Sequence, residues 1–128
     1  MEVASSDKYI PMVYVNQRGE VYYVAGGLFV PGEIHLVSAD LSVDECLYRT
    51  GEGLSIWDVD LDASRDILYF SEVSYEEFKS RLLCISGGEV KTLVEEVDGW
   101  IGNVVASPAH GVFFTASNEG CTAIYQYT

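Results

Sequence analysis

Short apolar runs, separated by polar or glycine-rich turns, recur along the whole chain. The central stretch, residues 56–96, contains four of them: Ile56–Leu61, Ile67–Phe70, Leu82–Ile85 and Val90–Val94. β-Branched and aromatic residues are common in these runs, as in strands. The segment Ser86–Glu89, with its two glycines, is a strong turn signal. The pattern predicts four consecutive strands joined by short turns, which is an antiparallel meander.

Similar runs lie on both sides of this stretch. The same pattern predicts strands at Ile10–Val15, Glu20–Val24, Glu33–Ser38, Val43–Tyr48, Ile101–Ala106, Gly111–Thr115 and Thr122–Tyr127. We expect Ala25–Gly32 and Ser71–Ser80 to be loops, because glycine, proline and polar residues predominate in them.

An apolar trio marks the second strand of each predicted unit. The trios are Val21-Tyr22-Tyr23, Leu68-Tyr69-Phe70 and Val112-Phe113-Phe114, and their middle residues are 47 and 44 positions apart. Four strands repeating about every 45 residues is the period of propeller blades. Consecutive apolar positions also imply burial on both faces of these strands. The alternative is a β-sandwich in which the spacing is coincidental.

The sequence therefore predicts an all-β fold, an incomplete β-propeller of nearly three four-stranded antiparallel blades. Residues 1–128 form a single partial propeller domain, with units at about 9–50, 54–97 and 100–128. Propellers close with roughly four to eight blades. We therefore expect ring closure by self-association or with another propeller chain, unless the chain is a fragment of a longer one.

The charge balance excludes one class of partner. Twenty Asp and Glu against seven Lys and Arg give a net charge of −13. Such a surface repels phosphate backbones, so we expect no nucleic-acid binding. We expect no cofactor, although the acidity leaves open a cationic small molecule or a divalent cation such as calcium. The simplest interpretation of the acidity is solubility.

The remaining patterns bear on the cellular compartment and on metal binding. No apolar run approaches the roughly 18 residues of a membrane span, and Met1–Asp7 does not look like a signal peptide. We therefore expect no membrane partner and a cytoplasmic location. Cys46, Cys84 and Cys121 are odd in number and widely spaced, which predicts buried free thiols. His35 and His110 show no ligand spacing relative to them, so no metal site is assigned.

The region from Ile56 to Tyr127 resembles a known family. Asp58–Asp62 followed by Ile67–Glu72 is similar to an N-D-x-D-V-D-P…x-x-Y-F-T-D segment. Arg81-Leu82-Leu83 with Glu89–Leu93 is similar to G-R-L-L…E-V-x-V-L strands. Gly102–Pro108 and Ile124–Tyr127 are similar to N-G-V-A-x-S-P-D-G and I-x-R-Y. These segments belong to the strictosidine synthase, SMP-30 and gluconolactonase group of six-bladed β-propellers.

The resemblance implies a propeller fold and, as one alternative, part of a hydrolase or lyase. In the metal-dependent lactonases of this group, asparagines before the innermost strands bind the metal. This chain has Trp57 at one such position and the reversed pair Gly102-Asn103 at the other. No catalytic residue is therefore assigned, and the chain alone is not expected to be an enzyme.

Meander geometry predicts where a binding site would lie. The loops that enter the first strands and those between second and third strands should share one rim, and loops on a rigid scaffold commonly carry binding sites. The candidate ligand-binding residues on this rim are Trp57, Asp58, Glu72, Trp100 and Asn103. Aromatic rings and carboxylates together could hold a cation or an amine. The alternative is that both tryptophans pack between blades and the carboxylates are solvated. The leading hypothesis is a binding or assembly module with a ligand or partner surface on this rim.

Overall fold

The chain folds into three antiparallel sheets. The computed structural model describes residues 1–27 and 29–128, so position 28 of the expected loop Ala25–Gly32 lies outside the described residues. The first sheet contains β1 (Met12–Val15), β2 (Val21–Gly27), β3 (Val30–Val37) and β4 (Asp44–Arg49). The second contains β5 (Leu54–Asp62), β6 (Ile67–Ser74), β7 (Lys79–Ser86) and β8 (Glu89–Asp98). The third contains β9 (Trp100–Ser107), β10 (Gly111–Asn118) and β11 (Cys121–Tyr127).

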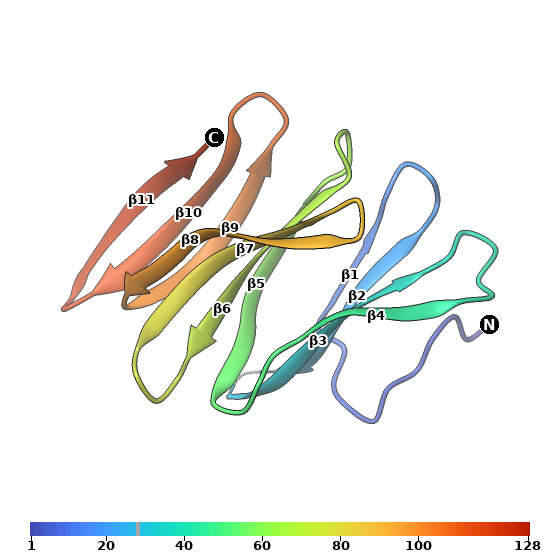
Figure 1. Cartoon of the computed structure of the whole chain (residues 1–128), viewed down its shortest axis with the longest axis horizontal. Coiled ribbons are helices and arrows are strands. Elements are labelled where there is room, and N and C mark those ends of the chain that lie inside the picture. The colour runs from blue at the N-terminus through green and yellow to red at the C-terminus, as the bar shows by residue number, and fades with distance from the viewer. Residues whose placement is uncertain (28) are drawn as a thin grey trace.

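The three sheets lie side by side in chain order, with the N-terminus and the C-terminus at opposite ends of the row (Figure 1). Strands are neighbours in the order in which they follow each other in the sequence. The described residues contain no helix, and hence none that could cross a membrane. The expectation of an all-β, antiparallel chain is confirmed.

All eleven strands predicted from the apolar pattern are present, but several are longer than predicted. The prediction of a loop at Ser71–Ser80 is wrong for most of that segment, because β6 continues to Ser74 and β7 begins at Lys79. Glu72 lies opposite Arg81 in this ladder, so charge pairing allows a polar sequence to form a strand. Likewise, strand residues extend into both ends of Ala25–Gly32.

The core lies between neighbouring sheets. One buried cluster joins the first and second sheets around Phe70, Ile34 and Leu68. Another joins the second and third sheets around Leu82, Ile101 and Val112. β2 and β6 have other parts of the chain packed on both faces and are buried almost continuously, as their consecutive apolar residues predict.

The third trio behaves differently. β10 alternates between buried and half-buried positions, and Phe113 is on its more exposed face. The expectation of two-sided burial is therefore wrong for β10. The physical reason is that no sheet among the described residues covers the outward face of the third sheet.

The outward face of the first sheet is partly covered by the N-terminal segment. Ala4 and Ile10 pack against Tyr23, Ala25 and Val37 on this face. The backbone N–H of Gly26 donates to the carbonyl of Tyr9 at 2.7 Å and fixes the segment there. The coverage is incomplete, because Val13 and Val15 of β1 remain exposed.

The cysteine prediction is partly wrong. All three cysteines are free, and Cys84 is buried as expected. Cys46 and Cys121 are exposed, because β4 and β11 are the outermost strands of their sheets and have few neighbours.

Candidate functional site

Five aromatic side chains form a cluster where the second-to-third strand turns and the first strands of the next sheets meet. We call this cluster the aromatic rim, and it consists of Phe29, Trp57, Tyr75, Phe78 and Trp100. The rings of Trp57 and Trp100 are 4.3 Å apart between centroids and nearly perpendicular. Phe29 lies within 6.0 Å of both tryptophans. The rim therefore joins residues from all three sheets.

The two phenylalanines of the rim are unusual in backbone and exposure. Phe29 has φ 64° and Phe78 has φ 54°, a region that bulky L-residues rarely adopt. These two residues are 54% and 63% exposed. Phe78 is held by its N–H, which donates to Ser74, and by its carbonyl, which accepts the N–H of Gly99 at 2.6 Å. Strained residues that the surroundings hold in place are typical of recognition sites.

The two tryptophans are half-buried and cross the junction between the second and third sheets. Trp100 packs against Phe78 at 5.8 Å on the other side. Among the described residues, its indole N–H is buried without a hydrogen-bond partner. Within the rim, the two tryptophans therefore form the half-buried base, and the two phenylalanines form the exposed surface.

Asp58 follows Trp57 directly, but it does not belong to the rim and instead forms hydrogen bonds between sheets. Its Oδ2 accepts the backbone N–H of Val104 on β9 at 2.7 Å, and its own N–H donates to Ser71 Oγ at 3.1 Å. Burial raises the pKa of Asp58 above the ordinary aspartate value, and this outweighs the opposite effect of the Val104 N–H. The carboxylate joins the second sheet to the third.

Glu72 is fully enclosed, with 2% exposure. Its carboxylate accepts two hydrogen bonds from Arg81, at 3.0 and 2.5 Å, and one from the Tyr48 hydroxyl. Burial, followed by the hydrogen bond to Glu72, raises the pKa of Tyr48 to about 12. Glu72 therefore joins β4 of the first sheet to β6 and β7 of the second.

Asn103 is exposed on the outward face of the third sheet. Its backbone N–H and its Nδ2 donate to Thr115 Oγ1, at 3.1 and 3.3 Å. The five predicted residues thus divide into three environments. The tryptophans come together in the rim, the two carboxylates connect neighbouring sheets, and Asn103 is exposed on the outward face of the third sheet.

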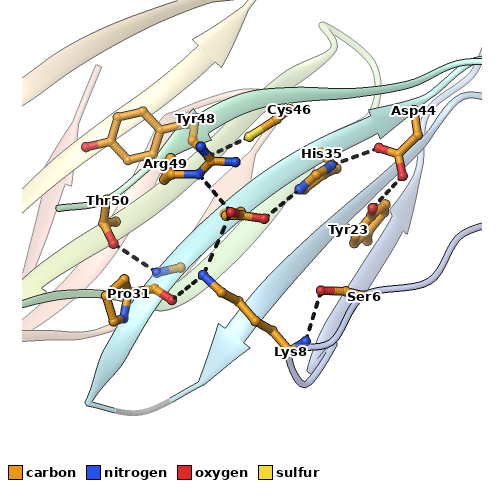
Figure 2. Close-up of polar contacts among 12 residues, drawn as sticks. Ser6, Lys8, Tyr23, Pro31, His35, Asp44, Cys46, Tyr48, Arg49 and Thr50 are labelled. Carbon is orange, nitrogen blue, oxygen red and sulfur yellow. Dashed lines mark hydrogen bonds and ion pairs between the residues drawn. The ribbon is translucent and has the colours of Figure 1, made fainter. Parts of the chain in front are cut away.

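A second polar cluster was not anticipated from the sequence. It lies on the outward face of the first sheet, where His35 of β3 is directly opposite Cys46 of β4 (Figure 2). Glu33, two residues before His35, shares this face and its carboxylate bonds to Arg49 and His35. The hydrogen bond from His35, and then that from Arg49, lowers the pKa of Glu33 against the opposing effect of burial.

Only part of this cluster could be predicted from the sequence. Glu33 and His35 alternate in one strand and must share a face. The pairing of His35 with Cys46 depends on the β3–β4 register, which shifts at a bulge between Ile34 and His35. Linear spacing does not reveal that shift.

No protein-family model and no curated protein matches this chain.

Proposed function

We propose that this chain is an assembly module that closes a six-sheet β-propeller with a second copy of itself. The outward face of the third sheet receives β1 of the partner copy, and the partner's third sheet receives β1 in return. Three sheets from each copy give the six blades of the propeller group that residues 56–127 resemble. The aromatic rim is the recognition surface of the assembly.

The observation that carries the proposal is a junction that the chain makes twice. The Tyr14 hydroxyl on the first sheet donates to the Val59 carbonyl of β5 at 2.6 Å. On the second sheet, Asp58 and Asp60 accept the N–H groups of Val104 and Ala106 of β9, each at 2.7 Å. In both cases a side chain of one sheet binds the backbone of the next sheet's first strand.

The third sheet has the same positions, and no strand among the described residues packs on them. Tyr14, Asp60 and Val105 each lie opposite the middle residue of the apolar trio in their own sheet, in the pairing of its first and second strands. Tyr14 and Asp60 bond to the next sheet, whereas Val105 is 55% exposed.

A second pair of positions repeats the pattern. The Asn103 N–H bonds to Thr115 Oγ1 as the Asp58 N–H bonds to Ser71 Oγ. Asn103 therefore occupies, in the third sheet, the position that Asp58 occupies in the second sheet, where it binds the first strand of the next sheet.

The open face has the chemistry of an interface. A hollow of about 330 Å³ on it is lined by Asn103, Val105, Phe113, Phe114, Thr115 and Ile124. Ile124 is 75% exposed. None of these lining residues is charged, so this face contributes no charge to an interface between two acidic chains. Exposed apolar surface of this kind marks association sites.

β1 fits this face as the occupant. Its Val13 and Val15 take the register positions that Val104 and Ala106 take in β9, since each pair faces the third and first residues of a trio. Both valines are exposed, and the N-terminal segment leaves them uncovered. The partner's β1 would thus continue the row as β5 and β9 do.

The test is the solution molar mass by light scattering on a size-exclusion column. The monomer is 14.1 kDa, and we expect twice that mass for the unmodified chain. Val105→Asp places a charge in the interface and should yield monomer. Val90→Asp, at an exposed valine of β8, is the matched control and should stay dimeric. A monomer at every concentration, an open-ended series of larger species, or a dimeric Val105→Asp variant would contradict the proposal.

The rim's role as a recognition surface has its own test. Exposed aromatic faces on an acidic protein favour a cationic ligand, and Glu76 and Glu77 directly precede Phe78. Both tryptophans of the chain belong to the rim, so tryptophan fluorescence reports binding there. Tetramethylammonium should change this fluorescence relative to sodium chloride at equal ionic strength. Phe78→Ser should weaken the response, whereas Tyr9→Ser, at an exposed aromatic elsewhere, should not. An unchanged response in Phe78→Ser would exclude the rim as the site.

A further inference from the structure

The outward face of the first sheet brings together three side chains with different metal-binding atoms. They are the carboxylate of Glu33, the imidazole of His35 and the thiol of Cys46, and their ligand atoms all lie within 4.8 Å of one another. The strand pairing places His35 opposite Cys46, and the strand alternation places Glu33 beside His35. Rigid sheet backbone therefore carries all three groups.

The imidazole of His35 is held in a defined orientation. Asp44 Oδ1 lies 2.8 Å from Nδ1, and the ring stacks on Tyr23 with centroids 4.7 Å apart and planes 11° apart. Asp44 is itself fixed by the Tyr23 hydroxyl, which donates to Oδ2 at 2.6 Å. A carboxylate on one ring nitrogen is the usual outer partner of a metal-binding histidine, because it places the proton there and leaves the other nitrogen free. Figure 2 shows Asp44 and Tyr23 on the side of His35 away from Cys46.

The other ring nitrogen, Nε2, is hydrogen-bonded to Glu33 Oε1, which lies 3.0 Å away. The other carboxylate oxygen, Oε2, bonds to Arg49 at 2.7 Å and lies 3.8 Å from Lys8. The two oxygens of Glu33 thus have separate partners. Arg49 and Lys8 fix the carboxylate through Oε2, and Oε1 stays directed at His35.

We propose that Glu33, His35 and Cys46 form a binding site for a first-row transition ion of the Zn²⁺ type. Zinc binds carboxylate, imidazole and thiolate at about 2.0–2.3 Å, in tetrahedral geometry. Binding requires the Glu33 and Cys46 side chains to rotate, because the ligand atoms lie within 4.8 Å of one another but not around one centre. In the single chain the fourth position faces solvent, because Cys46 is exposed, and takes water or a ligand.

The donor set selects the class of ion. Calcium and magnesium prefer oxygen ligands, whereas a thiolate with an imidazole favours zinc, cobalt and related ions. Binding displaces the thiol proton of Cys46, together with any proton on His35 Nε2. The bond from His35 to Glu33 is then replaced by two bonds to the ion. The site goes beyond the assembly proposal, because its ligands come from β3 and β4 of one copy, whereas the assembly docks β1.

The experiment uses Co²⁺ as a spectroscopic substitute for Zn²⁺ on the full chain, under reducing conditions. We expect a near-ultraviolet charge-transfer band, which requires a thiolate ligand, and its loss when Zn²⁺ is added. Cys46→Ser should abolish the band. Cys121→Ser, at the other exposed cysteine, is the matched control and should keep it. Asp44→Asn removes the outer carboxylate and should weaken Co²⁺ binding by about 10- to 100-fold.

Three results would overturn the proposal: no charge-transfer band in the unmodified chain, the same band in Cys46→Ser, or its loss in Cys121→Ser. Because Cys46 is exposed on an outer strand, Cys46→Ser should fold, and its circular dichroism spectrum in the presence of a chelator checks this. His35→Asn is the second variant and should lower Co²⁺ affinity even where the thiolate remains. Unchanged Co²⁺ affinity in His35→Asn would exclude the imidazole as a ligand.

Discussion

The side chain of Asp60 on β5 accepts the backbone N–H of Ala106 on β9, with a distance of 2.7 Å between Oδ2 and N. The bond spans two sheets and uses an N–H that points away from the ladder of β9 with β10. A carboxylate acceptor makes such a bond stronger than one between neutral groups. The junction between the second and third sheets therefore has directional polar bonds in addition to apolar contact.

Removing this acceptor should weaken the junction. Asp60→Ala leaves the Ala106 N–H without its partner and should lower the free energy of unfolding by about 1–3 kcal/mol. Asp60→Asn retains an oxygen acceptor and should cost less than Asp60→Ala. Urea unfolding followed by circular dichroism measures both variants. An equal loss in both would show that charge, and not the hydrogen bond, is what the junction needs.

Asp58 should give the protein a pH dependence of unusual sign. Burial raises its pKa in the folded state, so the folded chain holds this proton more tightly than the unfolded chain. Stability from this group is therefore greatest at low pH and falls as the pH rises from about 4, the ordinary aspartate value, through the raised pKa. Asp58→Asn removes the titration. The free energy of unfolding of the unmodified protein minus that of Asp58→Asn should fall with rising pH and then level off. A difference that rises with pH would contradict the raised pKa.

The Glu72–Arg81 pair should be coupled in a double-mutant cycle. Glu72→Gln leaves the Arg81 guanidinium with a weaker partner inside the second sheet. The expected loss is about 2 kcal/mol, below the range for fully buried pairs because the Arg81 side chain is partly exposed. Arg81→Met in the Glu72→Gln background should cost less than Arg81→Met alone. Additive losses would mean that the two side chains do not depend on each other.

Two glycines at positive φ should respond very differently to alanine. A Cβ at Gly99, which has φ 100°, would lie 2.0 Å from the Ser117 carbonyl oxygen, whereas at Gly53, with φ 80°, it would meet nothing within 4 Å. Gly53→Ala should cost about 1–2 kcal/mol for the backbone conformation alone. Gly99→Ala must also displace β10 from the link between β8 and β9, so its loss should be clearly larger. Thermal unfolding of both variants measures the contrast, and equal losses would contradict the close approach at Gly99.

The strands were predictable because apolar runs and glycine turns are local signals. The ends of β6 and β7 were not, because Ser71–Ser80 is polar and forms a strand only when Glu72 meets Arg81 across the ladder. The burial of β2 and β6 followed from their composition. The incomplete burial of Phe113 on β10 did not, because burial of one face depends on whether another layer covers it.

The candidate site was predictable in position more than in role. Strand order and turn geometry placed Trp57 and Trp100 at the same rim, and the structure brings their rings together. Asp58 and Glu72 belong to junctions between sheets, which depend on how the sheets pack. The cluster at His35 required the register of β3 with β4, including its bulge. Such non-local information is absent from residue spacing.

The burial of β2 and β6 has a consequence for how freely this sequence can change. Both strands have protein on each side, so a polar substitution at nearly any of their positions meets apolar neighbours and costs stability. The outermost strands, β4, β8 and β11, are mostly exposed and tolerate replacement with little cost. In a library of single substitutions selected for folding, tolerance should therefore increase outward across the first and second sheets, from a restrictive second strand to a permissive last one.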